Sequence, residues 1–181
     1  MDRLVLVRHA MPVPDPDVPS ERWRLGEPGR AAARALRAVL PPDAYLVASD
    51  EPKAVQTLQE AAGQPDVATD PDFGEVRRPY VWAADEDYRS VARAYVEGAA
   101  HAGWEPHAAV AARFGAAVAR HAALAGHRTL VVGTHGLSPT VWLAGVVRLE
   151  PSPAGFWQSL GYPDVVDVDL AAGRATRRAG P

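Results

Sequence analysis

Two patterns of hydrophobic and polar positions divide the chain. Short, unbroken apolar runs predict buried strands, and longer stretches in which apolar residues recur every three or four positions predict helices. The runs predict strands at 4–7, 44–48, 67–69 and 129–133, and the alternation at 165–170 followed by 174–178 predicts a hairpin. The helical spacing predicts helices at 30–40, from a Ser49–Asp50 cap to about 62, and at 85–100, 106–125 and 139–147.

Strands that alternate with helices favour an α/β fold, here a three-layer α/β/α sandwich around a mostly parallel sheet with helices on both faces. In such sheets ligands bind beyond the carboxyl ends of the strands. Three of the predicted strands end at Arg8-His9, Ser49-Asp50 and His135-Gly136. The chemistry of the protein is therefore expected at this edge.

Composition narrows the class of protein. The 181 residues suit one domain, 1–181, and the absence of cysteine excludes disulfide scaffolds, thiolate metal sites and cysteine catalysis. A net charge of −3 argues against a nucleic-acid binder. The apolar run Leu4–Val7 is interrupted by Arg8 and His9, and Val141–Val147 is far shorter than a membrane span. We expect a cytoplasmic protein that binds neither nucleic acid nor membranes.

The Arg-His dipeptide occurs twice, so by itself it is weak evidence for a site. Arg120-His121 falls inside a predicted helix, where neighbouring residues face different ways, and we expect it at a solvated surface. Arg8-His9 instead ends a buried strand and precedes a proline-rich loop. Lys53 is the single lysine among 19 basic residues, which also sets it apart.

Four segments read together resemble the histidine phosphatase superfamily, which includes the phosphoglycerate mutases. "LVLVRHAMP" is similar to its first strand and Arg-His-Gly signature, and "ASDEPKAVQT" to its Ser, Arg-Ala and Thr element. "DPDFGEVRRP" resembles the segment of the acidic proton donor, and "LVVGTHGLSPT" the late His-Gly element. The segments follow family order and span about 130 residues. Two positions depart from the pattern: Ala10 stands in place of glycine and Lys53 in place of arginine.

The resemblance implies hydrolysis of a phosphomonoester through a phosphohistidine on His9, without a metal or other cofactor. A histidine nucleophile splits phosphoryl transfer into two easier steps. Positive charge from Arg8 and Lys53, with His135 as a protonated group or a neutral donor, would stabilise the phosphoryl oxygens. Glu75 would protonate the leaving group and then activate water. The residues implied for catalysis are His9, Glu75, Arg8 and His135, and those for substrate binding are Arg8, Lys53, His135, Gly136 and Ser49.

Several alternatives stay open. A phosphoglycerate-type mutase is disfavoured by the short chain, in which only a helical insertion at about 79–104 is available as a cap. A phosphohistidine protein phosphatase would take a phosphoprotein instead of a small phosphomonoester. A phosphate-ligand binding protein would be catalytically weak because of Ala10 and Lys53. Arg77 and Arg78 suit a second anionic group or are surface charges, and Tyr80 and Trp82 would line an apolar end of the site; the oligomeric state is not indicated.

Overall fold

Six strands form one mixed sheet in the computed structural model, which describes residues 4–79 and 85–178. The strand order is β3-β2-β4-β1-β5-β6. β1, β2, β3 and β4 run parallel, whereas β5 pairs antiparallel with both β1 and β6. The strands are β1 Leu4–Arg8, β2 Ala44–Ala48, β3 Ala68–Thr69, β4 Thr129–Thr134, β5 Asp164–Asp169 and β6 Arg174–Arg177. The predicted mostly parallel α/β sheet is confirmed.

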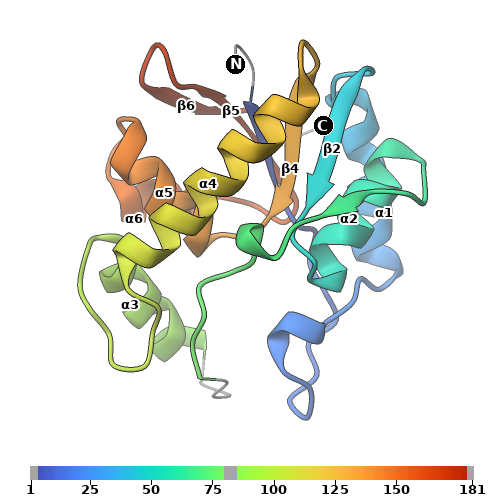
Figure 1. The fold of residues 1–181 in the computed structure, drawn as a ribbon. Coiled ribbons are helices and arrows are strands. Elements are labelled where there is room, and N and C mark those ends of the chain that lie inside the picture. Colours follow the sequence, from blue (N-terminus) through green and yellow to red (C-terminus); the bar gives the residue numbers. More distant parts are fainter. Residues whose placement is uncertain (1–3, 80–84, 179–181) are drawn as a thin grey trace.

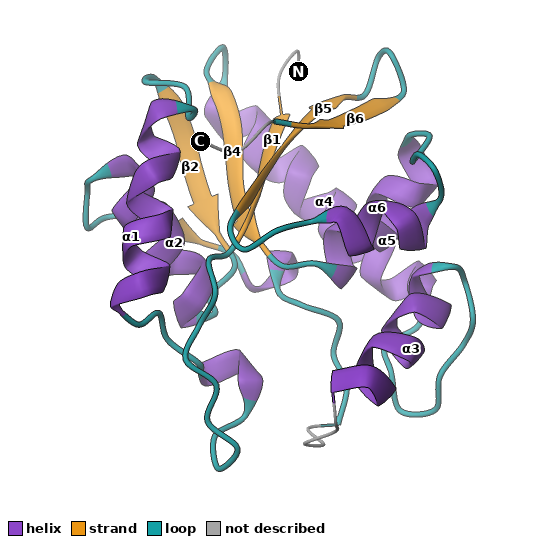
Figure 2. Ribbon diagram, turned by 180° about the vertical axis from the view of Figure 1, so that it is seen from behind, coloured by secondary structure: helices purple, strands orange, loops and turns teal. Residues whose placement is uncertain are grey.

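Helices cover both faces of the sheet (Figures 1 and 2). The α-helices are α1 Glu27–Ala35, α2 Pro52–Ala62, α3 Asp85–Val96, α4 His107–Ala125, α5 Leu137–Val146 and α6 Pro153–Ser159. Short 3-10 helices lie at Ser20–Arg22 (η1), Leu36–Ala38 (η2) and Pro71–Phe73 (η3). No helix within the described residues is both long enough and apolar enough to cross a membrane.

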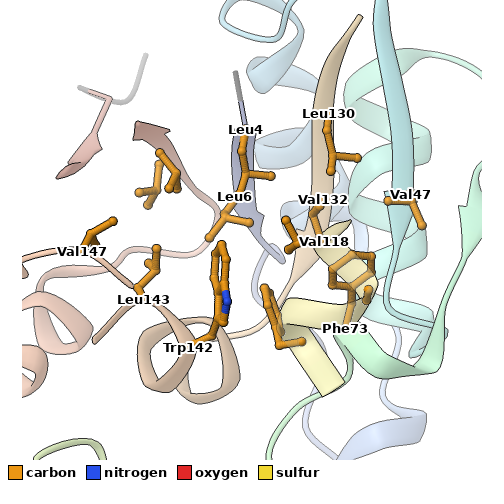
Figure 3. Packing of buried hydrophobic residues seen from close by; sticks show 14 of the residues in the cluster. Leu4, Leu6, Val47, Phe73, Val118, Leu130, Val132, Trp142, Leu143 and Val147 are labelled. Carbon is orange, nitrogen blue, oxygen red and sulfur yellow. The ribbon is translucent and has the colours of Figure 1, made fainter. Parts of the chain in front are cut away.

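Alternation along β1 divides the core into two layers, because successive side chains of a strand point to opposite faces. Leu4 and Leu6 pack with Phe114 of α4 and Trp142 of α5. Val5 and Val7 pack instead against Leu36, Leu58 and their neighbours near α1 and α2. Figure 3 shows Trp142 beside Leu6 in the first layer. Burial on both faces therefore fixes the register of β1, and with it the position of the residues that follow.

The hydrogen-bond ladder continues one residue past two strand ends. The backbone N–H of His9 donates to the Thr134 carbonyl over 3.0 Å, and that of Ser49 donates to the Gly133 carbonyl over 2.8 Å. Because β1, β2 and β4 run parallel, their carboxyl ends meet at one edge of the sheet. His9 and Ser49 are held there by these backbone bonds, and His135 directly follows the last residue of β4.

Several element boundaries differ from the predictions. The helix predicted at 30–40 begins at Glu27 after Gly26 and ends in the 3-10 turn η2. α5 begins two residues before Pro139, because the first N–H groups of a helix need no partner inside it and proline is tolerated there. α6 was not predicted.

The prediction that Arg120 and His121 both lie at a solvated surface is wrong for His121. His121 is 7% exposed, and its Nε2 lies 2.8 Å from Oδ2 of Asp70. Its ring also contacts Phe73 in η3, which packs against α4. The histidine is therefore a partnered residue of the core, and only Arg120 of the pair is exposed to solvent.

Candidate active site

His9 is held with one ring nitrogen available for chemistry. Its Nδ1 lies 2.8 Å from the Ala10 carbonyl oxygen, which can only accept, so Nδ1 carries the proton. Within the described residues no group is hydrogen-bonded to Nε2, which therefore presents a lone pair. Burial, followed by the neighbouring His135, Lys53 and Arg8, holds the pKa of His9 well below 6.5. The ring is a neutral imidazole, as a nucleophile must be.

His135 lies beside His9, with ring centroids 5.2 Å apart. Its Nε2 is 2.9 Å from Oγ of Ser49 and 3.2 Å from Oε1 of Glu51. Since a carboxylate only accepts, the proton of the neutral ring lies on Nε2. Burial and the charge of Lys53 lower its pKa well below 6.5, which favours the neutral donor over the protonated group. Its Nδ1 is buried and has no partner among the described residues.

Arg8 spans from the sheet edge to the turn that follows α6. Its Nη1 donates to the Leu160 carbonyl over 2.8 Å, Nη2 donates to the Tyr162 hydroxyl, and its guanidinium lies over the Tyr162 ring. The Nε atom is buried without a partner among the described residues. A Cβ added at Gly136 would lie 3.2 Å from Arg8 Nη2. Gly136 therefore gives Arg8 room to approach.

Lys53 is buried with a carboxylate. Its ammonium donates to the Ser20 carbonyl over 2.8 Å and pairs with Oε2 of Glu51, and the two side chains are 7% and 12% exposed. Lys53 is thus no helix-surface lysine. An ammonium has three donors, so one remains for a ligand. Glu51 balances the Lys53 charge within the site.

Glu75 binds the start of α5. Oε2 accepts the N–H groups of Gly136 and Leu137, and Oε1 accepts that of Ser138, over 2.8–3.1 Å. Oε1 also accepts the N–H of the adjacent Val76. Burial alone would raise the pKa of Glu75, but His135, Arg78 and the backbone N–H groups together lower it to about 2. Glu75 is therefore ionised in this arrangement, and the Gly136 N–H is already engaged.

The two arginines after Glu75 occupy different environments. Arg77 is exposed, whereas Arg78 is half-buried between the rings of Tyr88 and Trp104, at 5.3 and 5.4 Å from their centroids. The charge of Arg78 also lowers the pKa values of Glu75 and His135. Of the two arginines, Arg78 is therefore the one whose positive charge influences Glu75 and His135. Tyr80 and Trp82 lie outside the described residues.

Ala10, which replaces the glycine of the family pattern, is accommodated without backbone strain. No residue other than glycine has a positive φ in the described part of the chain, and Ala10 is completely buried beside Leu25 and Ala33. Its N–H donates to Oγ1 of Thr57 over 2.9 Å. Only the extra methyl group distinguishes this position from glycine.

The structure brings together all seven residues that the sequence singled out: Arg8, His9, Ser49, Lys53, Glu75, His135 and Gly136. Sequence reasoning missed two others, Glu51 and Tyr162, which bond to Lys53 and Arg8. An acid two residues before the only lysine was a usable signal for Glu51. Across residues 4–79 and 85–178, no cluster of three His, Asp or Glu side chains is arranged to hold a metal ion.

A neutral histidine at a sheet edge, among basic groups, is an arrangement that can accept a phosphoryl group. The chain belongs to the histidine phosphatase superfamily (branch 1), whose family model matches residues 4–174. A comparison with curated proteins finds no match.

Solved structures share the fold. A mycobacterial glucosyl-3-phosphoglycerate phosphatase in complex with inorganic phosphate is 24% identical, with a TM-score of 0.69 and coverage of 99% of this chain and 97% of that one. The same phosphatase with VO3 gives a TM-score of 0.71 at 24% identity, covering 99% and 98%. A phosphoserine phosphatase mutant from Entamoeba histolytica, in complex with phosphoserine, is 15% identical, with a TM-score of 0.69 and coverage of 99% and 96%.

Proposed function

We propose that this protein hydrolyses a small phosphomonoester through a covalent phosphohistidine on His9. The observation that carries the proposal is the state of His9: Nδ1–H is fixed on the Ala10 carbonyl, the ring is neutral and Nε2 is unpartnered among the described residues. The fold neighbours named for phosphoserine and glucosyl-3-phosphoglycerate support a phosphorylated small molecule as the substrate class. We expect the described part of the insertion, residues 85–104, to serve as the cap, since Tyr88 and Trp104 lie against Arg78.

In the first step Nε2 of His9 forms a bond to phosphorus while the bond from phosphorus to the ester oxygen breaks. The transition state spreads negative charge over the phosphoryl oxygens, so stabilisation comes mainly from positioned cations and donors. For the phosphoryl oxygens, Arg8 has an unpartnered N–H at Nε and Lys53 has a third N–H. The Ser49 hydroxyl orients the ring of His135. The departing alkoxide needs a proton, and Glu75 is our candidate for its donor.

In the second step water attacks phosphorus, the bond to Nε2 breaks, and inorganic phosphate leaves. An ionised carboxylate can accept the proton of the attacking water. The low pKa of Glu75 suits it to this second step. For the first step Glu75 has to take up a proton when substrate binds, giving up N–H bonds at the start of α5.

The test is release of inorganic phosphate from a panel of phosphomonoesters that includes alkyl, aryl and sugar phosphates. We expect turnover by the wild type and none by the folded His9→Ala variant. The wild type should carry acid-labile, base-stable phosphate on His9 during turnover. If His9→Ala keeps more than a small share of the activity, the covalent mechanism is wrong.

The Lys53–Glu51 pair favours a second candidate, a phosphate-ligand binding protein with weak catalysis. A carboxylate that offsets the Lys53 charge weakens the attraction of the site for an oxyanion. The same panel separates the two functions. Phosphate binding by the wild type without release of phosphate from any ester would select the binding protein.

A further inference from the structure

Within residues 4–79 and 85–178, Glu51 is the one acidic side chain that contacts two of the residues expected to hold the phosphoryl group. Its Oε2 pairs with Lys53, and its Oε1 lies 3.2 Å from Nε2 of His135. Oε1 also accepts the backbone N–H of Glu75 over 3.0 Å. The side chain is only 12% exposed, so water screens these interactions weakly. A carboxylate is thus built into the proposed phosphoryl site.

An ionised carboxylate in this place opposes the binding of a dianion. Arg8, Lys53 and Arg78 bring three positive charges to the site and its surroundings, and Glu51 and Glu75 bring two negative charges. The balance is one positive charge, which leaves a bound dianion with one charge uncompensated. A single proton restores neutrality.

The structure also offers places for that proton. Nδ1 of His135 is buried and has no partner among the described residues, while Nε2 of the same ring faces Glu51. Since Nε2 already carries the proton of the neutral ring, an added proton would occupy Nδ1, and the charged ring would then face the Glu51 carboxylate through its Nε2–H. Because the two groups are in contact, the proton belongs to the pair and not to either residue alone.

The groups that face this pair are fixed by four elements. Lys53 reaches Glu51 from α2, and the Ser49 hydroxyl contacts His135 from the end of β2. His9 lies against His135 from the end of β1. The Glu75 carboxylate, bound to the start of α5, acts on His135 from the loop after η3. The proton that Glu75 takes up in the proposed first step serves an ester's leaving group. With an anion that has no leaving group, Glu75 keeps its bonds to the backbone N–H groups, so Glu51 and His135 are the pair left to take up the proton.

We propose that Glu51 is a further positioning residue of the phosphoryl site, and that it makes this site bind a phosphoryl group together with one proton held by the Glu51–His135 pair. The inference rests on the proposed function, because it assumes that oxyanions bind beside His9. It assigns a ligand class: a singly protonated phosphoryl group, or a dianion accompanied by a proton from water.

Sulfate and inorganic phosphate separate the contributions of charge and proton. At about pH 8 both are mainly tetrahedral dianions, but only phosphate still carries a proton. Sulfate affinity of the wild type should fall about tenfold for each unit of rising pH, which is the slope for uptake of one proton. At about pH 8 the wild type should bind phosphate at least about tenfold more tightly than sulfate, because one charge-assisted hydrogen bond distinguishes them.

Glu51→Gln keeps the shape and the acceptor for the Glu75 N–H but removes the charge. In this variant sulfate binding should become nearly independent of pH, and the preference for phosphate should shrink to within about threefold. Glu60→Gln is the matched control: it removes a carboxylate from the same helix, where Glu60 pairs with Arg30 and Arg34, and should behave as the wild type. Calorimetry in buffers of different ionisation enthalpy counts the protons taken up.

The outcomes separate this inference from the proposed function. If the wild type binds neither sulfate nor phosphate, the inference and the proposed function are both wrong. If the wild type binds both anions equally at about pH 8, without proton uptake, the inference is overturned while the phosphatase proposal stands. The same holds if Glu51→Gln weakens binding at every pH with an unchanged slope, which would make Glu51 a structural partner of Lys53 only. The wild-type measurements decide the matter even if the variant does not fold.

Discussion

The two cations of the site are held in opposite ways. Arg8, at the end of β1, donates to neutral acceptors, the Leu160 carbonyl and the Tyr162 hydroxyl. Lys53, on α2, is paired with the Glu51 carboxylate. A cation bonded to neutral groups keeps its electric field, whereas a cation bonded to a carboxylate contributes a field only when that carboxylate is discharged. Arg8 therefore attracts an anion at any pH, whereas under the inference above the Lys53–Glu51 pair attracts one only when a proton is taken up as well.

Among the residues around His9, the largest effect is expected from Glu75→Gln, because Glu75 contacts both Glu51 and the start of α5. Its N–H donates to Glu51, and its carboxylate holds the start of α5 after His135. Turnover of an alkyl phosphate should fall by roughly 10²- to 10⁴-fold, the usual share of general acid–base catalysis. An aryl phosphate with a good leaving group should lose much less in the first step. Equal losses for both esters, in steady-state and burst kinetics, would remove Glu75 as the donor and leave Asp72 as the next candidate.

The same variant tests the role of Glu75 in stability. The pKa of Glu75 is about 2 in the folded protein against an ordinary 4.5, so its contribution is present above about pH 4.5 and is lost as pH falls toward 2. This shift corresponds to roughly 3 kcal/mol. Urea unfolding between these pH values should show a shallower loss of stability in Glu75→Gln than in the wild type. A parallel pH dependence of the two proteins would contradict the assignment.

Arg8→Ala should come next, with a loss of about 10²- to 10³-fold in kcat, similar to removing one oxyanion donor. Arg8→Lys should recover little of it, since an ammonium cannot reproduce the planar fork that reaches Leu160 and Tyr162. The phosphate-release assay measures both variants. Recovery by lysine would mean that only the charge of Arg8 matters, and the contrast with Lys53 would disappear.

A smaller loss of phosphate binding and turnover is expected from substitutions of Lys53, and its size should depend on whether Glu51 is present. Lys53→Ala leaves Glu51 uncompensated, so phosphate binding and turnover should fall by about 10- to 100-fold at pH 8. The double variant with Glu51→Gln should return to within about fivefold of the wild type, because the pair as a unit adds little charge. Lys53→Arg should lower activity, since the buried ammonium lies close to both Ser20 and Glu51. Additive losses in the double variant would refute the contrast between the two cations.

Tyr162→Phe should have the smallest effect, a loss of about two- to fivefold. It removes one acceptor of Arg8 but keeps the ring under the guanidinium. Oxyanion affinity should change as little as turnover does. Tyr45→Phe, which removes a hydroxyl near His121 and away from the site, is a suitable control. A loss as large as that of Arg8→Ala would show that the hydroxyl itself touches the reacting group.

The sequence predicted the parts of the site that depend on strand ends. Unbroken apolar runs locate buried strands, and parallel strands bring their carboxyl ends to one edge, so His9, Ser49 and His135 could be placed together. Tyr162 could not be placed, because its position follows from the turn between α6 and β5, which depends on packing between distant segments. α6 itself was missed although Ser152 and Pro153 form a usable helix start, with Ser152 Oγ accepting the Gly155 N–H.

Charge pairing was harder to predict than position. Glu51 stands at the start of α2, where acidic residues are common for helix-dipole reasons, so only its spacing from Lys53, and not its residue type, was a signal for the site. Glu75 was singled out, but its bonds to the N–H groups of Gly136, Leu137 and Ser138 depend on α5 beginning at Leu137, two residues earlier than predicted. Tertiary structure decides that Glu75 bonds to backbone N–H groups while Glu51 pairs with a side-chain cation.

The central position of β1 has a consequence for how the chain folds. β1 comes first in sequence, yet it lies between β4 and β5, and the His9 N–H is bonded to β4 more than half the chain away. Contacts this distant in sequence close late and slow folding. During synthesis β1 must wait, with both edges unpaired, until β4 and β5 have emerged from the ribosome. His9, the proposed nucleophile, is thus made well before β4 and β5 and is set in place only when β4 has paired with β1.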